Sequence, residues 1–192
     1  MRADFRVVLD ACVLAPANLC ELLLCLAETP RLYLPFWSEE ILTEVRRTQT
    51  TKLNWPAHLA DYWQVQVRSA FPEAVVERYQ PLLPSCTNSE KDRHVLAAAI
   101  KGHAEVIVTS NLRDFPPDSL TPWDIKAVDP ASFLINLYTI EPGVLVSRLV
   151  GIANRRKLAA EDLLSRIGKS APAFSQHLAQ ALGWDLPETG VK

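Results

Sequence analysis

The fold class of this chain is decided by the segment Ser89-Glu-Lys-Asp-Arg-His-Val-Leu-Ala-Ala-Ala-Ile-Lys-Gly-His-Ala-Glu-Val-Ile-Val-Thr109. Its first half predicts a helix over Arg93–Lys101, because Ser89-x-x-Asp92 resembles a capping box and Gly102 is a typical residue just past a helix end. Its second half, Glu105–Thr109, is a short β-branched run that indicates a buried strand. A helix followed at once by a buried strand favours a parallel sheet.

The same alternation extends to both sides of this segment. Three more strands are predicted, at 5–9, 31–35 and 125–128, with further helices at 19–27, 38–47 and 130–138. Ser38 is the expected N-cap of its helix, with Glu39 and Glu40 in the first turn. The order β-α-β-α-β-α-β predicts an α/β fold, a parallel sheet flanked by helices on both faces.

Two regions fall outside this alternation. Residues 48–84 form an aromatic-rich helical insert that prolines interrupt, and residues 144–184 predict two or three short helices without strands. Residues 111–122 read as a loop or a single turn. We therefore expect a domain over residues 1–138, a helical C-terminal extension over 139–186, and a disordered tail over 187–192.

Composition narrows the class of protein. The chain has 192 residues, of which 48% are hydrophobic, enough for a packed core. The net charge of −2 excludes a globally basic nucleic-acid-coating protein, so any nucleic acid would meet a local patch. The four cysteines form no C-x-x-C pair and the histidines no H-x-x-x-H, which argues against zinc and for free thiols in the cytoplasm. The apolar run 22–27 is too short to cross a membrane.

Four acidic residues occupy positions where a parallel sheet would gather them. Asp10 and Asp114 follow predicted strands, Asp92 lies near a helix start, and Glu44 lies on a helix. The carboxyl ends of parallel strands form one crevice, where ligands bind. Carboxylates collected there repel one another unless a cation joins them. The sequence therefore predicts a divalent metal site suited to phosphoryl chemistry.

Each of these acids also has an ordinary structural interpretation. Asp10 could be a turn or N-cap residue, Asp114 a solvated loop residue, and Asp92 an acid favoured by the helix dipole. Glu44 lies on the edge of the apolar stripe formed by Trp37, Ile41 and Val45. No single acid decides the question, and the hypothesis depends on their joint order along the chain.

With these segments in place, the sequence resembles the PIN domain family, and more closely its VapC-type ribonuclease toxins of bacterial toxin–antitoxin pairs. The resemblance covers about residues 5–138. The matching segments are Val7–Leu14, Ser38–Val45, Lys91–Ala99 and Val108–Pro116.

The resemblance implies a Mg²⁺ or Mn²⁺ site with Asp10, Asp92 and Asp114 as ligands. Glu44 would complete the catalytic set through water, through a second ion, or by orienting the nucleophile, and Asn111 would contact the substrate. The family often has Thr or Ser after the first Asp and a polar residue next, where this chain has Ala11 and Cys12. That departure bears on hydroxyl contacts and leaves the acids unchanged.

The resemblance also implies an RNA substrate, a cognate antitoxin protein and a homodimer, with no membrane partner. Three alternatives stay open: a PIN-type nuclease of RNA maturation or DNA processing, a domain that only binds, and a receiver-like signalling domain. The receiver is disfavoured because strand 5–9 is followed by a single acid. Basic and aromatic side chains could contact nucleic acid, although surface solvation and core packing are the commoner roles: Arg46, Arg47, Arg93, Lys101, Arg113, Trp37, Trp55 and Trp63.

Overall fold

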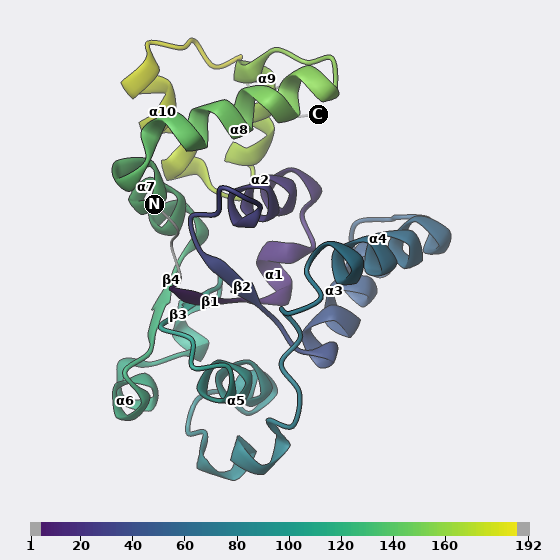
Figure 1. The fold of residues 1–192 in the computed structure, drawn as a ribbon, viewed down its shortest axis with the longest axis vertical. Coiled ribbons are helices and arrows are strands. Elements are labelled where there is room, and N and C mark those ends of the chain that lie inside the picture. Colours follow the sequence, from purple (N-terminus) through teal and green to yellow (C-terminus); the bar gives the residue numbers. More distant parts are fainter. Residues whose placement is uncertain (1–4, 188–192) are drawn as a thin grey trace.

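A computed structural model describes residues 5–187 of the chain, so residues 188–192 of the predicted tail lie outside the described residues. Within that range, four parallel strands form one sheet in the order β2-β1-β3-β4 (Figure 1). The strands are β1 Arg6–Leu9, β2 Leu34–Phe36, β3 Val106–Val108 and β4 Lys126–Val128. The predicted α/β fold with a parallel sheet is confirmed.

Helices connect and follow the strands. Those before β4 are α1 Ala11–Leu14, α2 Ala17–Ala27, α3 Glu39–Thr51, α4 Ala57–Ala70, α5 Arg93–Lys101 and α6 Pro117–Leu120. After β4 come α7 Pro130–Ile140, α8 Pro142–Arg155, α9 Ala160–Gly168 and α10 Pro172–Leu182. Short 3₁₀ turns lie at η1 Gln80–Ser85, η2 Glu90–Asp92, η3 Leu112–Asp114 and η4 Thr121–Trp123.

The N-terminal half differs from the prediction in two places. Strand β2 begins three residues later than expected, because its pairing with β1 starts where Arg6 faces Leu34. Residues 11–14, for which no element was predicted, form the one-turn helix α1, whose first N–H donates to the Asp10 side chain. The N-cap role of Ser38 is confirmed, since its hydroxyl accepts the Ile41 N–H at 3.2 Å.

The capping box predicted before α5 is wrong. In the described chain neither Ser89 nor Asp92 makes a side-chain capping hydrogen bond; η2 intervenes, and Asp92 itself is the N-cap residue of α5. Gly102 ends α5 as the C-cap residue with a φ of −78°, and the left-handed residue is His103. The glycine is needed for space, because a Cβ there would lie 3.1 Å from Val76 Cγ2.

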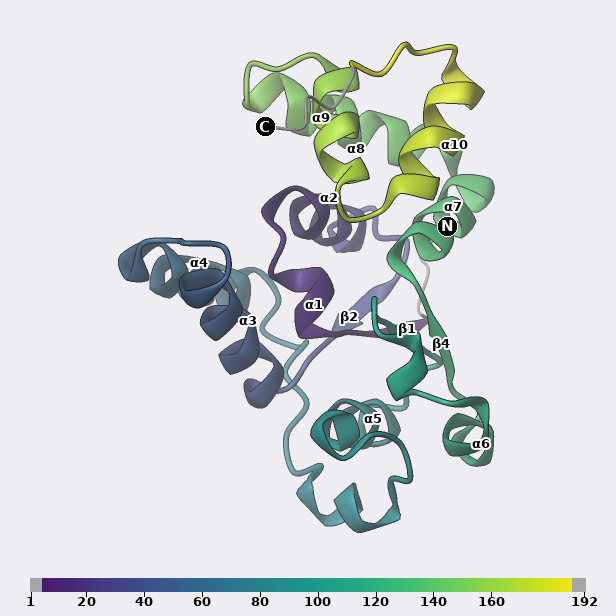
Figure 2. The same ribbon diagram turned by 180° about the vertical axis from the view of Figure 1, so that it is seen from behind.

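Helices cover both faces of the sheet. In Figures 1 and 2, α2 and α7 lie on one side and α5 on the other. The strands are consequently mainly apolar, with exposed Arg6 and Lys126 at the starts of β1 and β4, and Val7, Val8 and Ile107 are fully buried. The α3–α4 hairpin projects from the body in both views, held partly by a bridge between Trp37 and Val75.

The C-terminal helices share the core of the sheet region. Helices α8 and α9 pack on α2, and one apolar cluster runs from the strands to Leu149 and Phe174. Arg155 and Arg156 both pair with Glu21 of α2. Hydrophobic packing, rather than these exposed ion pairs, supplies most of the attachment.

In residues 5–187, no single helix combines the length and apolar character needed to cross a bilayer. Helices α7 and α8 reach that measure only when joined, and a bend of 118° separates them.

If the extension is part of the same cooperative unit, deleting core volume there will destabilise the whole chain. Leu149→Ala is expected to lower the free energy of unfolding by about 2–5 kcal/mol in urea denaturation, because this side chain is fully buried. The matched control is Leu59→Ala on α4, where the side chain is 46% exposed. A Leu149→Ala effect no larger than the control, or a separate unfolding transition, would show that the extension unfolds on its own.

Candidate active site

Asp10 is fixed at the carboxyl end of β1 by hydrogen bonds to both carboxylate oxygens. Its Oδ1 accepts the Ala11 N–H at 2.6 Å, and its Oδ2 accepts the Thr109 hydroxyl at 2.6 Å. Its own N–H donates to Val108 O at 3.1 Å, which continues the pairing of β1 with β3. The N-cap interpretation of Asp10 is therefore correct, and it places the 3% exposed carboxylate at the strand end.

A thiol and a hydroxyl surround the Asp10 carboxylate. Cys12 Sγ lies 3.2 Å from Asp10 Oδ2 and accepts the Ser110 N–H at 3.2 Å. Burial, reinforced by the Asp10 charge, raises the pKa of the Cys12 thiol to about 12. Cys12 thus stays a neutral thiol that supplies a weak donor where the resembled family often has polar residues.

Asp92 and Asp114 lie beside each other and share a counter-ion. Lys91 Nζ donates to Asp114 Oδ2 at 2.9 Å and lies 3.6 Å from Asp92 Oδ2. The Ser89 N–H donates to Asp114 O at 3.1 Å, which joins η2 to η3. Asp114, for which loop solvation was the alternative interpretation, is paired with Lys91 of η2, and its side chain is 17% exposed.

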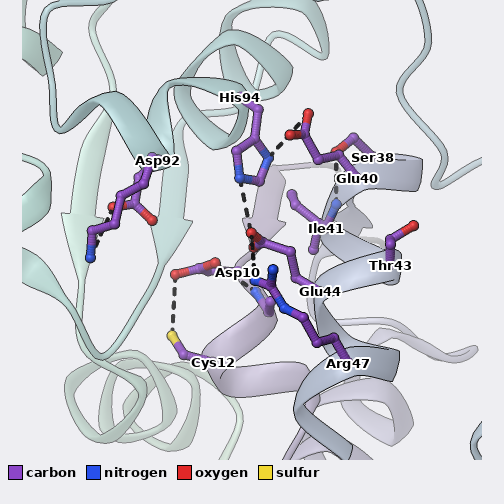
Figure 3. A network of polar contacts seen from close by, with 12 residues as sticks. Asp10, Cys12, Ser38, Glu40, Ile41, Thr43, Glu44, Arg47, Asp92 and His94 are labelled. Carbon is purple, nitrogen blue, oxygen red and sulfur yellow. Dashed lines mark hydrogen bonds and ion pairs between the residues drawn. The ribbon is translucent and has the colours of Figure 1, made fainter. Parts of the chain in front are cut away.

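Glu44 approaches the same place from α3. Figure 3 shows Glu44 and Asp92 on either side of Asp10. Arg47 donates to Glu44 Oε1 at 3.4 Å, and His94 Nε2 of α5 lies 3.6 Å from Glu44 Oε2. From the edge of the apolar stripe of α3, the Glu44 side chain thus turns toward Asp10 and the strand ends.

Burial and neighbouring acids raise the pKa of two of the four carboxylates, Asp92 and Glu44. Burial raises the pKa of Asp92, and the charges of Asp10 and Asp114 raise it further, while Lys91 opposes the shift. Burial also raises the pKa of Glu44, with the charges of Asp10 and Asp92 acting in the same direction and His94 against it. The fold therefore holds Asp10, Glu44, Asp92 and Asp114 together as one acidic cluster.

A divalent cation fits this cluster by donor chemistry. Carboxylate oxygens are the ligands that Mg²⁺ and Mn²⁺ prefer. Asp92 Oδ2 is buried with no hydrogen-bond partner among residues 5–187, and it lies in the field of two other carboxylates. No three acidic, His or Cys side chains of the described chain already converge at metal-coordinating distance. The carboxylate oxygens lie near one another, and binding of a cation would draw them closer.

A strand-end acid is not sufficient to join the cluster. Asp129 follows β4, but its Oδ1 accepts the Ala131 and Ser132 N–H groups, both at 3.0 Å, and so caps α7. Backbone and hydroxyl hydrogen bonds from Ser132 hold the pKa of Asp129 below its usual value, although burial opposes them. The Asp129 side chain thus makes the hydrogen bonds of the α7 cap, and none of these links it to the other four acids.

Of the other residues predicted to contact substrate or nucleic acid, one lies beside the acidic cluster and several do not. Asn111 is half-buried and its N–H donates to Thr109 Oγ1 at 3.1 Å, which puts it beside the cluster. Arg46 is engaged by Asp61 on α4, and Trp37 is fully buried, so packing is the role of that tryptophan. Trp55 and Trp63 line a cavity of about 350 Å³ between α2, α4 and α8, away from the acids.

Sequence reasoning missed several contributors. It did not single out Lys91, His94 or Glu40, although Lys91 and His94 flank Asp92 and Glu40 lies one helical turn before Glu44. Their nearness in sequence to Asp92 and Glu44 could have marked them as neighbours of the site. The contacts themselves cross between α5, α3 and η3, which no local pattern reveals.

The chain belongs to the PIN domain family, whose sequence model matches residues 6–113, more than half of the chain. The match contains Asp10, Glu44 and Asp92 and ends one residue before Asp114. Among curated proteins, the chain is 35% identical over 130 residues to "Putative ribonuclease VapC50" of Mycobacterium tuberculosis (strain ATCC 25618 / H37Rv). That alignment covers 65% of this chain and 76% of the relative. The search of solved structures found no significant match.

Thr109 offers a test of how the Asp10 carboxylate is held. Thr109→Val keeps the shape of this fully buried side chain but removes the hydroxyl that donates to Asp10. We expect the free energy of unfolding to fall by about 1–3 kcal/mol, the cost of leaving a buried charged acceptor without its donor. Thr109→Ser should restore most of the loss in chemical denaturation; equal stability of the Val and Ser variants would contradict the assignment.

Asp92 offers a test of the repulsion within the cluster. Because folding raises the pKa of Asp92, the native chain holds a proton there more tightly than the unfolded chain does, and the ionised form opposes folding at neutral pH. Asp92→Asn should therefore unfold at higher denaturant than wild type at pH 7 in EDTA. The difference should shrink as pH falls below the ordinary aspartate range. Asp185→Asn, at an exposed acid, is the control; an Asp92→Asn variant less stable at pH 7 would contradict the prediction.

Proposed function

We propose that this protein is a Mg²⁺- or Mn²⁺-dependent endoribonuclease, the toxin of a VapBC-type toxin–antitoxin pair. The observation that carries the proposal is the acidic cluster at the carboxyl ends of β1 and β3: Asp10 after β1, Glu44 on α3, Asp92 in η2 and Asp114 in η3. Burial and the charges of the neighbouring acids raise the pKa of Glu44 and of Asp92 there. Membership of the PIN domain family and similarity to a protein named as a ribonuclease support the same reaction.

Asp10, Asp92 and Asp114 would hold the cation. When bound, a divalent ion at such a site polarises a phosphodiester oxygen and lowers the pKa of water. Asp10 is the most rigid of the three, because Thr109 and the α1 N-terminus fix both of its oxygens. Glu44 would orient the attacking water, since it faces Asp10 and Asp92 from the opposite element.

The chain's own cations would assist at the edges of the cluster. Lys91 bridges Asp92 and Asp114 and could release them to contact a phosphate oxygen instead. Arg113 is exposed within η3, next to Asp114. Asn111 would contact the RNA beside the last acid. RNA rather than DNA is proposed from the family and from the relative's printed name.

The proposed partners are a cognate antitoxin and a second copy of the chain. The antitoxin is inferred from the VapC in the relative's name. An apolar stripe on α4 is available for protein contact, because Leu59, Tyr62 and Val65 recur at helical spacing and are 46–63% exposed. The four free thiols suit a reducing cytoplasm, which is where we propose that the protein acts.

Cleavage of RNA by the purified protein tests the proposal. We expect endonucleolytic cutting of single-stranded or loop RNA with Mn²⁺ or Mg²⁺, none with EDTA, and a loss of more than about a hundredfold in Asp10→Asn and Asp92→Asn. DNA of the same sequence and flap DNA serve as competing substrates. Asp185→Asn should cleave like wild type.

Unchanged cleavage in both aspartate variants would exclude the acidic cluster as the reacting centre. Preferential cutting of flap DNA would favour a PIN nuclease of DNA processing, and well-folded protein that binds RNA without cutting it would favour a binding role.

A further inference from the structure

The imidazole of His94 lies buried between two carboxylates of α3. Its Nδ1 is 3.9 Å from Glu40 Oε2 and its Nε2 is 3.6 Å from Glu44 Oε2 (Figure 3). Glu40 and Glu44 are four residues apart and therefore project from the same face of α3. The ring of His94, from the first turn of α5, spans the gap between them.

In this position, Glu40 and Glu44 are the candidate hydrogen-bond partners of the two His94 ring nitrogens. The side chain is 5% exposed, and neither ring nitrogen has a hydrogen-bond partner at hydrogen-bonding distance among residues 5–187. Buried polar atoms are normally paired, and each such exception calls for a reason. The carboxylates of Glu40 and Glu44 face the two nitrogens at 3.9 Å and 3.6 Å, each a small movement away from a hydrogen bond.

Glu40 is itself anchored from behind. Its Oε2 accepts the hydroxyl of Tyr79 at 2.8 Å, and Tyr79 is 4% exposed in the segment that follows α4. The result is a polar row, Tyr79–Glu40–His94–Glu44, that runs from the insert to the acidic cluster. On its far side Glu44 pairs with Arg47, whose side chain is 70% exposed, and exposed pairs of this kind hold a side chain weakly.

We propose that His94 is a positioning residue for Glu44, and that the imidazole, backed by Glu40, keeps the Glu44 carboxylate turned toward Asp10 and Asp92. The inference rests on the proposed metal-dependent function of the cluster. Groups that contact the ligands of a site from outside fix their orientation, and removing them typically weakens cation affinity 10- to 100-fold. An imidazole suits this task because its two nitrogens face opposite directions and can meet two opposed acids.

Direct Mn²⁺ binding without RNA provides the test, read by the electron paramagnetic resonance signal of free Mn²⁺. His94→Leu should weaken Mn²⁺ binding by about tenfold or more. His94→Gln, whose amide can occupy the Nε2 position facing Glu44, should recover most of the affinity. His94→Asn, whose amide occupies the Nδ1 position, should not. His58→Gln, an exposed histidine on α4, is the matched control.

Cleavage kinetics separate positioning from a general structural effect. The half-saturating Mn²⁺ concentration should rise and kcat should fall in His94→Leu, while KM for RNA stays within about twofold of wild type. Glu40→Gln should shift Mn²⁺ binding in the same direction by a smaller factor. Its side chain is 53% exposed, so this variant remains informative if His94→Leu does not fold.

The outcomes are distinguishable. If wild type binds Mn²⁺ and cleaves RNA, Asp92→Asn does not, and the His94 and Glu40 variants match His58→Gln, the role of His94 is overturned and the proposed function stands. A lower melting temperature with unchanged Mn²⁺ binding also overturns it, because it marks a purely structural residue. If wild type neither binds Mn²⁺ nor cleaves RNA, the proposed function fails and the role of His94 fails with it.

Discussion

The parallel pairing of β1 with β3 is the constraint on which the site depends. It places the residue after β1 against the residue after β3, so that the Thr109 hydroxyl meets Asp10 Oδ2 at 2.6 Å. That contact joins residues 99 positions apart in the chain. Because β1 is central in the sheet and buried on both faces, the position of Asp10 cannot adjust without disturbing the core. The other acids are arranged around this fixed carboxylate.

Basic side chains beside the cluster offset part of the repulsion among these acids. Lys91 spans Asp92 and Asp114, and His94 stands beside Glu44 and opposes the rise in the pKa of that acid. Holding like charges together therefore offsets part of the hydrophobic stabilisation of the fold. Such a local cost in stability is typical of functional sites rather than of structural ones. The satisfied cap at Asp129 shows the contrast within the same sheet.

Much of this arrangement was predictable from sequence, for identifiable reasons. Short, mainly apolar runs between helix signals marked all four strands, and Ser38 marked the start of α3, because these features are local. The start of β2 and the one-turn helix α1 were missed, since pairing with β1 and the cap from Asp10 decide them. Ser89 was misread as a cap because a 3₁₀ turn and a capping box share the same residues. The acids were proposed from their order along the chain, whereas the contacts of His94 and Lys91 cross between elements and follow from no local pattern.

The Lys91 bridge has a consequence for the order in which the protein matures. Lys91 and Arg47 are counter-ions supplied by the chain itself, one at the Asp114 end of the cluster and one at the Glu44 end. Because the Lys91 ammonium is covalently part of the chain, it reaches the acids as soon as the chain folds. Its presence there does not depend on the concentration of any ion in solution. The polypeptide can thus complete folding with its negative charge partly neutralised from within. For the divalent cation proposed above, binding would then be a step separate from folding, in which it takes the place of an ammonium group already present.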